Sequence, residues 1–234
     1  MRFLCLHGTG TNSQIFEMQS AALRAELGGH HTFHFLEGVI PVPPALEIAT
    51  YLTGKDECFT YCDYGSEGSI DKALRDLGNY VMEEGPFDGI MAFSQGASLA
   101  SMFLIQSLQR SHELLPRSPR NPHSRQDPCP VFRCAIFLSG VRPSDACLDT
   151  TAGVHSRWLD ERLDGVVIDI PTAHVFASDD PAIPGESEKL SKLCAADKRV
   201  IFIHNQGHEV PKSKEAVLGA VHAIRRVIDS ASTS

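Results

Sequence analysis

The sequence predicts an α/β fold in which a mostly parallel central sheet is covered by helices on both faces. Short β-rich runs alternate with longer amphipathic runs along the chain, which is the pattern of such a sheet. The runs 88–93 and 132–140 are almost continuously apolar, as is typical of strands covered on both sides. A chain of 234 residues, 42% of them hydrophobic, fits a single domain over residues 1–234.

Strands are expected where short apolar runs are bounded by turn residues. These segments are 2–7, 31–38, 88–93, 132–140, 171–178 and 199–204. Helices are expected between them, at about 14–27, 69–84, 97–110, 185–196 and 212–229. The last helix has the clearest pattern, because apolar residues from Ala216 to Ile228 recur at spacings of three and four.

Two segments do not follow the alternation of strands and helices. Residues 39–66 contain prolines and aromatic residues without a clear period, and they are too apolar for a plain linker. This segment could cover a pocket, although ordinary packing explains its apolar residues equally well. Residues 111–130 are polar and rich in proline, arginine and serine, so an exposed loop is expected there.

Composition excludes several kinds of partner. The net charge of −8 disfavours binding to nucleic acid or to an anionic membrane. No apolar run approaches the roughly 20 residues that span a bilayer, and the N-terminal run is too short for a signal peptide.

The 7 cysteines include no CxxC pair, and several lie in apolar runs. Buried free thiols in a reducing, cytoplasmic compartment are therefore expected.

The segment FDGIMAFSQGASLA, residues 87–100, places a serine where an apolar strand gives way to a helix. A serine hydroxyl becomes a good nucleophile only when a neighbouring base takes its proton and a carboxylate orients that base. In α/β hydrolases the serine lies at such a turn, within G-x-S-x-G. Here the turn is AFSQG, with Ser94 as the candidate nucleophile and Ala92 in place of the first glycine.

The partners of such a serine follow in the order acid, then histidine. Asp179 and Asp180 come directly after the strand 171–178, and either could be the acid. His208 lies between the last strand and the last helix. Ser94 alone could simply cap a helix, but the ordered partners favour a nucleophile.

The loop LHGTGTN after the first strand is the candidate source of an oxyanion hole. One amide is expected from Gln95, the residue after the nucleophile, and a second from this loop. Thr9 is the preferred second donor and Gly10 the next choice, while His7 is expected to shape the loop. No cofactor is implied, and no metal site is expected, because nothing near Cys58 and Cys62 completes a zinc set.

Four segments, CLHGTGTNSQIF, FDGIMAFSQGASLA, HVFASDDPAIP and NQGHEVP, resemble the motifs of the FSH serine hydrolases. This family is widespread in fungi and related to a human ovarian-cancer-associated hydrolase. The resemblance covers about residues 1–228 and implies an α/β-hydrolase fold without metal, acting on carboxylic or thiol esters through an acyl-enzyme. Alignment on Pro181 implies that Asp180 is the acid, although the family has Gly-x-x-Asp-Pro where this chain has Ala177-Ser178-Asp179-Asp180-Pro181.

The resemblance is greatest to fungal stand-alone thioesterases that release a polyketide from its synthase. It implies a small-molecule acyl ester or thioester as substrate and the acyl-carrier domain of a polyketide synthase as partner. Two alternatives stay open. One is a general carboxylesterase or acyl-protein thioesterase, because FSQGASLA also resembles those enzymes. The other is a hydrolase fold kept as a non-catalytic binding module.

Overall fold

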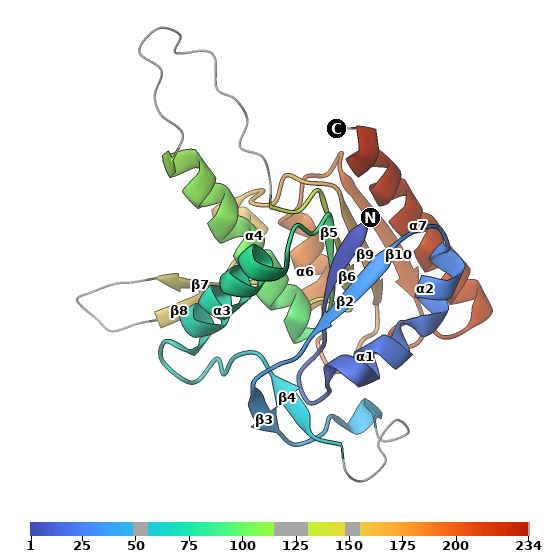
Figure 1. The fold of residues 1–234 in the computed structure, drawn as a ribbon, viewed down its shortest axis with the longest axis horizontal. Coiled ribbons are helices and arrows are strands. Elements are labelled where there is room, and N and C mark those ends of the chain that lie inside the picture. Colours follow the sequence, from blue (N-terminus) through green and yellow to red (C-terminus); the bar gives the residue numbers. More distant parts are fainter. Residues whose placement is uncertain (49–55, 115–130, 148–154, 234) are drawn as a thin grey trace, which may run out of the picture.

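The central sheet of the protein, seen in a computed structural model, consists of six parallel strands (Figure 1). The structure describes residues 1–48, 56–114, 131–147 and 155–233. The strand order is β10-β9-β6-β5-β1-β2. The strands are β1 (Arg2–Leu6), β2 (Thr32–Leu36), β5 (Gly89–Phe93), β6 (Cys134–Leu138), β9 (Thr172–Ala177) and β10 (Arg199–His204). Each lies within a predicted segment, so the predicted strands are confirmed.

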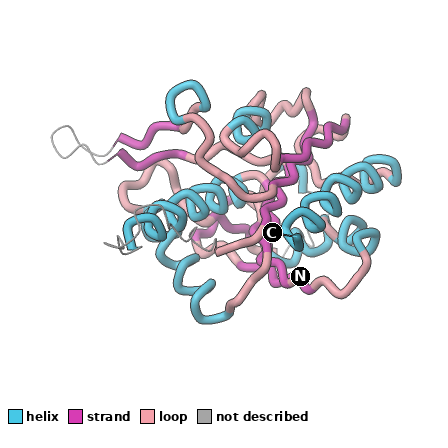
Figure 2. The backbone as a smooth tube through the Cα atoms, turned by 90° about the horizontal axis from the view of Figure 1, so that it is seen from above, coloured by secondary structure: helices cyan, strands magenta, loops and turns pink. Residues whose placement is uncertain are grey.

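Helices cover both faces of this sheet, as predicted (Figure 2). On one face lie α1 (Ser13–Gln19), α2 (Ala21–Leu27) and α7 (Lys214–Thr233). On the other lie α3 (Ser69–Glu84), α4 (Gln95–Leu114) and α6 (Glu186–Lys192), and a short helix, α5 (Glu161–Asp164), precedes β9. None of the helices in the described ranges combines the length and the apolar character needed to cross a membrane.

The core is divided into two layers by the alternation of side chains along each strand. In β1, Phe3 and Cys5 belong to the layer under α2 and α7, whereas Leu4 and Leu6 belong to the layer under α3 and α4. All four side chains are fully buried. Successive residues of a strand point to opposite faces, so a strand covered on both sides is apolar throughout.

Four helices differ from their predicted extent. The last, α7, begins at Lys214 and continues to Thr233, past the predicted end at 229. The predicted helix 14–27 is divided at Ser20, whose hydroxyl donates to the carbonyl of Phe16 at 2.8 Å, a bond that bends helices. The helix predicted at 185–196 ends at Lys192. In contrast, α4 continues to Leu114, so the predicted loop 111–130 begins inside a helix, and residues 115–130 lie outside the described part of the chain.

Two small antiparallel hairpins were not predicted. One pairs β3 (Ile40–Val42) with β4 (Cys58–Thr60), and a 3-10 helix, η1 (Leu46–Ile48), follows β3. The other pairs β7 (Ser144–Cys147) with β8 (His155–Trp158). The first hairpin occupies the segment 39–66, whose strands of three residues are too short to show a period.

The start of α4 lies close against the end of β1, and a glycine makes this approach possible. A Cβ on Gly96 would lie 2.5 Å from the carbonyl oxygen of His7 and 2.6 Å from that of Leu6. Both atoms belong to the backbone and cannot move aside easily. Gly96 therefore sets the distance between the helix that follows Ser94 and the strand that precedes the Thr9 loop.

We expect Gly96→Ala to lower the free energy of unfolding by about 2 kcal/mol or more, because the added methyl group overpacks a rigid backbone. The matched control is Gly78→Ala in α3, where the nearest heavy atom would lie 3.5 Å away. That variant should be more stable by about 0.5–1 kcal/mol, since alanine favours a helix. Urea unfolding measures both, and equal stability of the two variants would contradict the close approach.

Candidate active site

Ser94 lies in a strained turn between β5 and α4. Its φ of +52° is in the left-handed region that residues with a side chain rarely adopt. The turn is held because the amide of Ser94 donates to Leu138 of β6 at 3.0 Å, and its carbonyl accepts from the amide of Val141 at 3.3 Å. Strain of this kind, about 1–3 kcal/mol, persists where the surrounding structure fixes it, and it clusters at functional sites.

The structure brings the side chains of Ser94, His208 and Asp180 into one hydrogen-bonded chain. Nε2 of His208 lies 2.9 Å from Oγ of Ser94, and Nδ1 lies 2.7 Å from Oδ2 of Asp180. The ring of His208 also packs against Phe93, with the centroids 5.1 Å apart. With Nδ1 donating to the carboxylate, Nε2 is free to accept the proton of the serine hydroxyl.

Asp180 is buried and fixed by further hydrogen bonds. Its Oδ1 accepts from the amides of Ala182 at 2.9 Å and Ile183 at 3.3 Å. Burial raises the pKa of Asp180. The hydrogen bond from His208, the charge of His208 and the amides of Ala182 and Ile183 outweigh burial and hold the pKa below its usual value. The neighbouring Asp179 is exposed. Of the two candidate acids, the one in contact with the histidine is therefore Asp180.

Two backbone amides near Ser94 have no acceptor among the residues that the structure describes. They belong to Thr9 and Gln95, the predicted pair of oxyanion donors. The amide of Gly10, the second choice from sequence, instead donates to the carbonyl of Phe59 at 3.0 Å. That amide is engaged in holding the hairpin strand β4, so Gly10 does not suit the role of donor.

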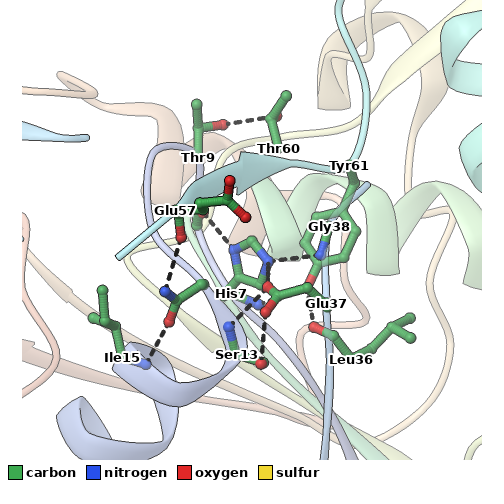
Figure 3. Close-up of polar contacts among 12 residues, drawn as sticks. His7, Thr9, Ser13, Ile15, Leu36, Glu37, Gly38, Glu57, Thr60 and Tyr61 are labelled. Carbon is green, nitrogen blue, oxygen red and sulfur yellow. Dashed lines mark hydrogen bonds and ion pairs between the residues drawn. The ribbon is translucent and has the colours of Figure 1, made fainter. Parts of the chain in front are cut away.

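His7 holds the loop that carries Thr9 (Figure 3). Its ring is fully buried, with Nδ1 2.7 Å from the carbonyl of Gly8 and Nε2 2.9 Å from the amide nitrogen of Gly38. The backbone amide of His7 donates to the hydroxyl of Tyr61 at 2.9 Å. These contacts join the end of β1 to segments on both sides of the β3–β4 hairpin, as expected for a residue that shapes the loop.

The carboxylate of Glu37 contacts the buried ring of His7. Its Oε1 lies 3.0 Å from Nε2 of His7 and accepts from the amide of Ser13 at 2.9 Å (Figure 3). Burial raises the pKa of Glu37, but the contacts with His7 and Ser13 outweigh it and lower the pKa overall. The carboxylate therefore stays ionised and connects the end of β1 to the start of α1.

The side chain of Gln95 connects the turn at Ser94 to the β3–β4 hairpin by hydrogen bonds. The sequence did not reveal this role. Oε1 of Gln95 accepts from the hydroxyl of Thr60 and from the amide of Tyr61, and Nε2 donates to the carbonyl of Cys62 at 2.9 Å. The side chain is 6% exposed and all its hydrogen-bonding atoms are engaged. Its position directly after Ser94 was the only signal in the sequence.

A small pocket opens at Ser94 and His208. Its wall combines Phe93 with residues of the Thr9 loop, of α1 and of the segment after β3, and the lining residues include Thr9, Thr11, Gln19, Ala45, Ile48 and Glu209. Ala45 and Ile48 come from the segment 39–66, which the sequence marked as a candidate cover. Thr11 and Gln19 were not singled out, because nothing in their local sequence distinguishes them.

Several other reactive side chains in the described part of the chain are buried and held in their neutral form. Burial raises the pKa of Cys62 to about 11 and that of Cys194 to about 12, so neither thiol is an available nucleophile. Burial likewise lowers the pKa of His174 to about 3. Burial also lowers the pKa of His204, partly offset by Asp180 and nearby carboxylates, and its Nδ1 accepts from the amide of Gln206. Both histidines belong to strands, as predicted.

The fold and the geometry together define a class. A serine in a strained turn after a central parallel strand, with a histidine and an aspartate from later loops at the same sheet edge, is the arrangement of the α/β hydrolases. A solved carboxylesterase from Mesorhizobium loti superposes with a TM-score of 0.57 at 16% identity, covering 97% of this chain and 88% of its own. The predicted α/β-hydrolase fold is confirmed.

Within this class, the model of the serine hydrolase (FSH1) family matches residues 1–219. The chain belongs to this family, which confirms the predicted resemblance and the prediction of a hydrolytic enzyme. Esterase FPY3 of Fusarium mangiferae is 39% identical, over 99% of this chain and 98% of its own. Hydrolase phiM of a fungal species (strain ATCC 74256) is 32% identical, over 93% of this chain and 90% of its own.

Replacement of Asp180 by asparagine tests the ionised hydrogen-bond network. Because the pKa of Asp180 is lower in the folded than in the unfolded chain, ionisation stabilises the fold above the unfolded value of about 3.9, and this contribution is lost as pH falls through the folded pKa. The stability advantage of the wild type over Asp180→Asn should therefore shrink as pH falls from about 5 through the folded pKa of Asp180.

Urea unfolding at a series of pH values measures this difference. Asp179→Asn is the matched control, because it removes an exposed carboxylate that makes no contact with His208. A stability difference between wild type and Asp180→Asn that stays constant over the whole pH range would contradict the network.

Proposed function

We propose that the protein hydrolyses carboxylic esters or thioesters through an acyl-enzyme, with Ser94, His208 and Asp180 as the catalytic triad. The observation that carries this proposal is the hydrogen-bonded chain from Ser94 Oγ through His208 to Asp180, with distances of 2.9 and 2.7 Å. Membership of the serine hydrolase family supports the same reaction type. The name of the fungal relative Esterase FPY3 supports an ester as the bond that is cleaved.

In the first step, Oγ of Ser94 attacks the carbonyl carbon of the substrate while Nε2 of His208 takes the hydroxyl proton. The carboxylate of Asp180 stabilises the resulting imidazolium through Nδ1. The negative charge on the substrate oxygen is bound by the unpaired amides of Gln95 and Thr9. The carbon–oxygen or carbon–sulfur bond then breaks, and His208 returns its proton to the departing alcohol or thiol.

In the second step, His208 takes a proton from water as the water oxygen attacks the acyl-Ser94 carbonyl. The acid is released and the proton returns to Oγ of Ser94. The sum of both steps is ester plus water giving acid plus alcohol or thiol, so no metal, cofactor or redox partner is needed.

The substrate that we propose is an acyl thioester of the polyketide type, presented by the acyl-carrier domain of a synthase in fungal secondary metabolism. The four sequence motifs and the fungal relatives support this choice. We further propose a cytoplasmic location. Five described cysteines are free and buried, as suits a reducing compartment: Cys5, Cys58, Cys62, Cys134 and Cys194.

A general carboxylesterase or acyl-protein thioesterase is the second candidate. It is favoured by the segment FSQGASLA, which also resembles those enzymes. An assay can separate the candidates. It compares the rate of hydrolysis of one acyl group on three carriers: an isolated carrier domain, a small thiol and a peptide cysteine. A marked preference for the carrier domain supports release from a synthase.

Replacement of Ser94 by alanine should lower kcat by about 10⁴-fold or more on any accepted thioester, because the nucleophile is lost. The circular dichroism spectrum and the thermal midpoint should stay close to those of the wild type. Stopped assays with a thiol reagent measure the loss. Hydrolysis at the original rate would rule out Ser94 as nucleophile, and failure of the native protein to react with a fluorophosphonate probe would favour a non-catalytic binding module.

The choice between the two aspartates is tested by Asp180→Asn and Asp179→Asn. We expect Asp180→Asn to lower kcat on the order of 10⁴-fold, because asparagine cannot hold the required tautomer of His208. Asp179→Asn should change kcat by less than about tenfold, since that carboxylate is exposed. Steady-state kinetics on one thioester compares them, and a larger loss in Asp179→Asn would reverse the assignment.

A further inference from the structure

Two polar side chains in the wall of the pocket are buried without a hydrogen-bond partner. Oγ1 of Thr11 and Oε1 of Gln19 have none among the residues that the structure describes. Thr11 is 2% exposed and Gln19 is 9% exposed. Both line the same pocket as Ser94 and His208. Because an unpaired buried polar atom is costly, native proteins contain few of them, and each calls for an explanation.

Other polar side chains in the Thr9 loop and the first turn of α1 do have hydrogen-bond partners. Asn12, which directly follows Thr11, accepts from the amide of Ile15 at 2.8 Å and donates to the carbonyl of Glu57 at 3.0 Å. The hydroxyl of Ser13 donates to the carboxylate of Glu37 at 2.9 Å. The loop and the first turn of α1 thus pair these polar groups within the protein, while Thr11 and Gln19, which line the pocket, each keep one oxygen atom without a partner among the described residues.

The rest of the pocket wall is suited to a carbon chain. Ala45 and Ile48 line the pocket from the segment after β3, and the ring of Phe93 lines it beside Ser94. Ile48 is 3% exposed and packs with Ile15 and Cys58 in a small apolar cluster. The pocket therefore offers apolar surface together with two unpaired polar atoms, beside the candidate nucleophile.

We propose that Thr11 and Gln19 bind a hydroxyl substituent on the acyl chain of the substrate near the carbonyl that Ser94 attacks. The unpaired Oε1 of Gln19 can only accept, whereas the hydroxyl of Thr11 donates or accepts. A hydroxyl substituent, which donates one hydrogen bond and accepts others, would pair with both atoms. The acyl chain becomes bonded to Ser94 in the first step and is released by water in the second, so residues beside Ser94 contact it in both.

The inference rests on the proposed hydrolytic function and narrows it to hydroxylated acyl esters or thioesters. A plain fatty acyl chain would fill the pocket and leave both polar atoms unpaired. A site built to hydrogen-bond a substrate oxygen discriminates strongly against the analogue that lacks it. Thr11 and Gln19 are in this view the residues that determine acyl specificity, not members of the triad.

The test uses the full-length protein and three N-acetylcysteamine thioesters with the same leaving group: hexanoyl, 3-hydroxyhexanoyl and 3-oxohexanoyl. We expect kcat/KM of the wild type to be at least about tenfold higher for 3-hydroxyhexanoyl than for hexanoyl, because only the hydroxyl can donate to Oε1 of Gln19. Thr11→Val and Gln19→Leu should each lower that ratio by about 5- to 10-fold. Thr11→Ser, which keeps the hydroxyl, should preserve it.

The matched control is Thr172→Val, which removes a buried hydroxyl that pairs with Nε2 of His174 at 3.1 Å, at the start of β9. It should alter the thermal midpoint but leave the ratio unchanged. If the wild type hydrolyses hexanoyl as well as 3-hydroxyhexanoyl, or if both pocket variants keep the wild-type ratio, the inference is wrong while the proposed function stands. If no thioester is hydrolysed and a fluorophosphonate probe does not label Ser94, both fail.

Discussion

The left-handed backbone of Ser94 is the constraint on which the site depends. A serine with φ of +52° is unfavourable by itself, so the turn needs support from outside the local sequence. The hydrogen bond to Leu138 anchors it to the neighbouring strand, and Gly96 lets α4 start against the backbone of β1. The sheet and the first turn of the helix together hold the serine hydroxyl at the edge where the other loops end.

The parallel arrangement of the sheet explains how residues so distant in sequence meet. Ser94 and His208 are separated by 114 positions, yet each follows the carboxyl end of a strand in the same sheet. In open parallel sheets these ends lie at one edge, where ligands are bound. Asp180 follows β9, which lies between β5 and β10 in the strand order, so Asp180 emerges between the loops that carry Ser94 and His208.

The sequence was sufficient for the parts of the molecule whose signals are local. The six strands and the positions of Ser94, His208 and the acidic pair follow from apolar runs and from the residues that end them. The β3–β4 hairpin could not be predicted, because it is stabilised by distant pairings such as that of Phe59 with Thr11. The choice of Asp180 over Asp179 needed either the family pattern or the contact with His208.

Local sequence signals encode the positions of the proposed catalytic residues, whereas the wall of the pocket depends on contacts between distant segments. This difference matters for substrate preference. The side chains of Ser94, Asp180 and His208, the proposed triad, keep fixed positions relative to strand ends, so short motifs encode them. The pocket wall around Thr11, Gln19 and Ile48 instead depends on how an irregular segment packs against the Thr9 loop. The side chain of Gln95 connects the pocket wall to the Ser94 turn. It accepts a hydrogen bond from Thr60 of the β3–β4 hairpin, and Gln95 directly follows Ser94. Substitutions in the wall can therefore change the acyl group that is accepted while the triad stays unchanged, provided that the bonds of Gln95 are kept.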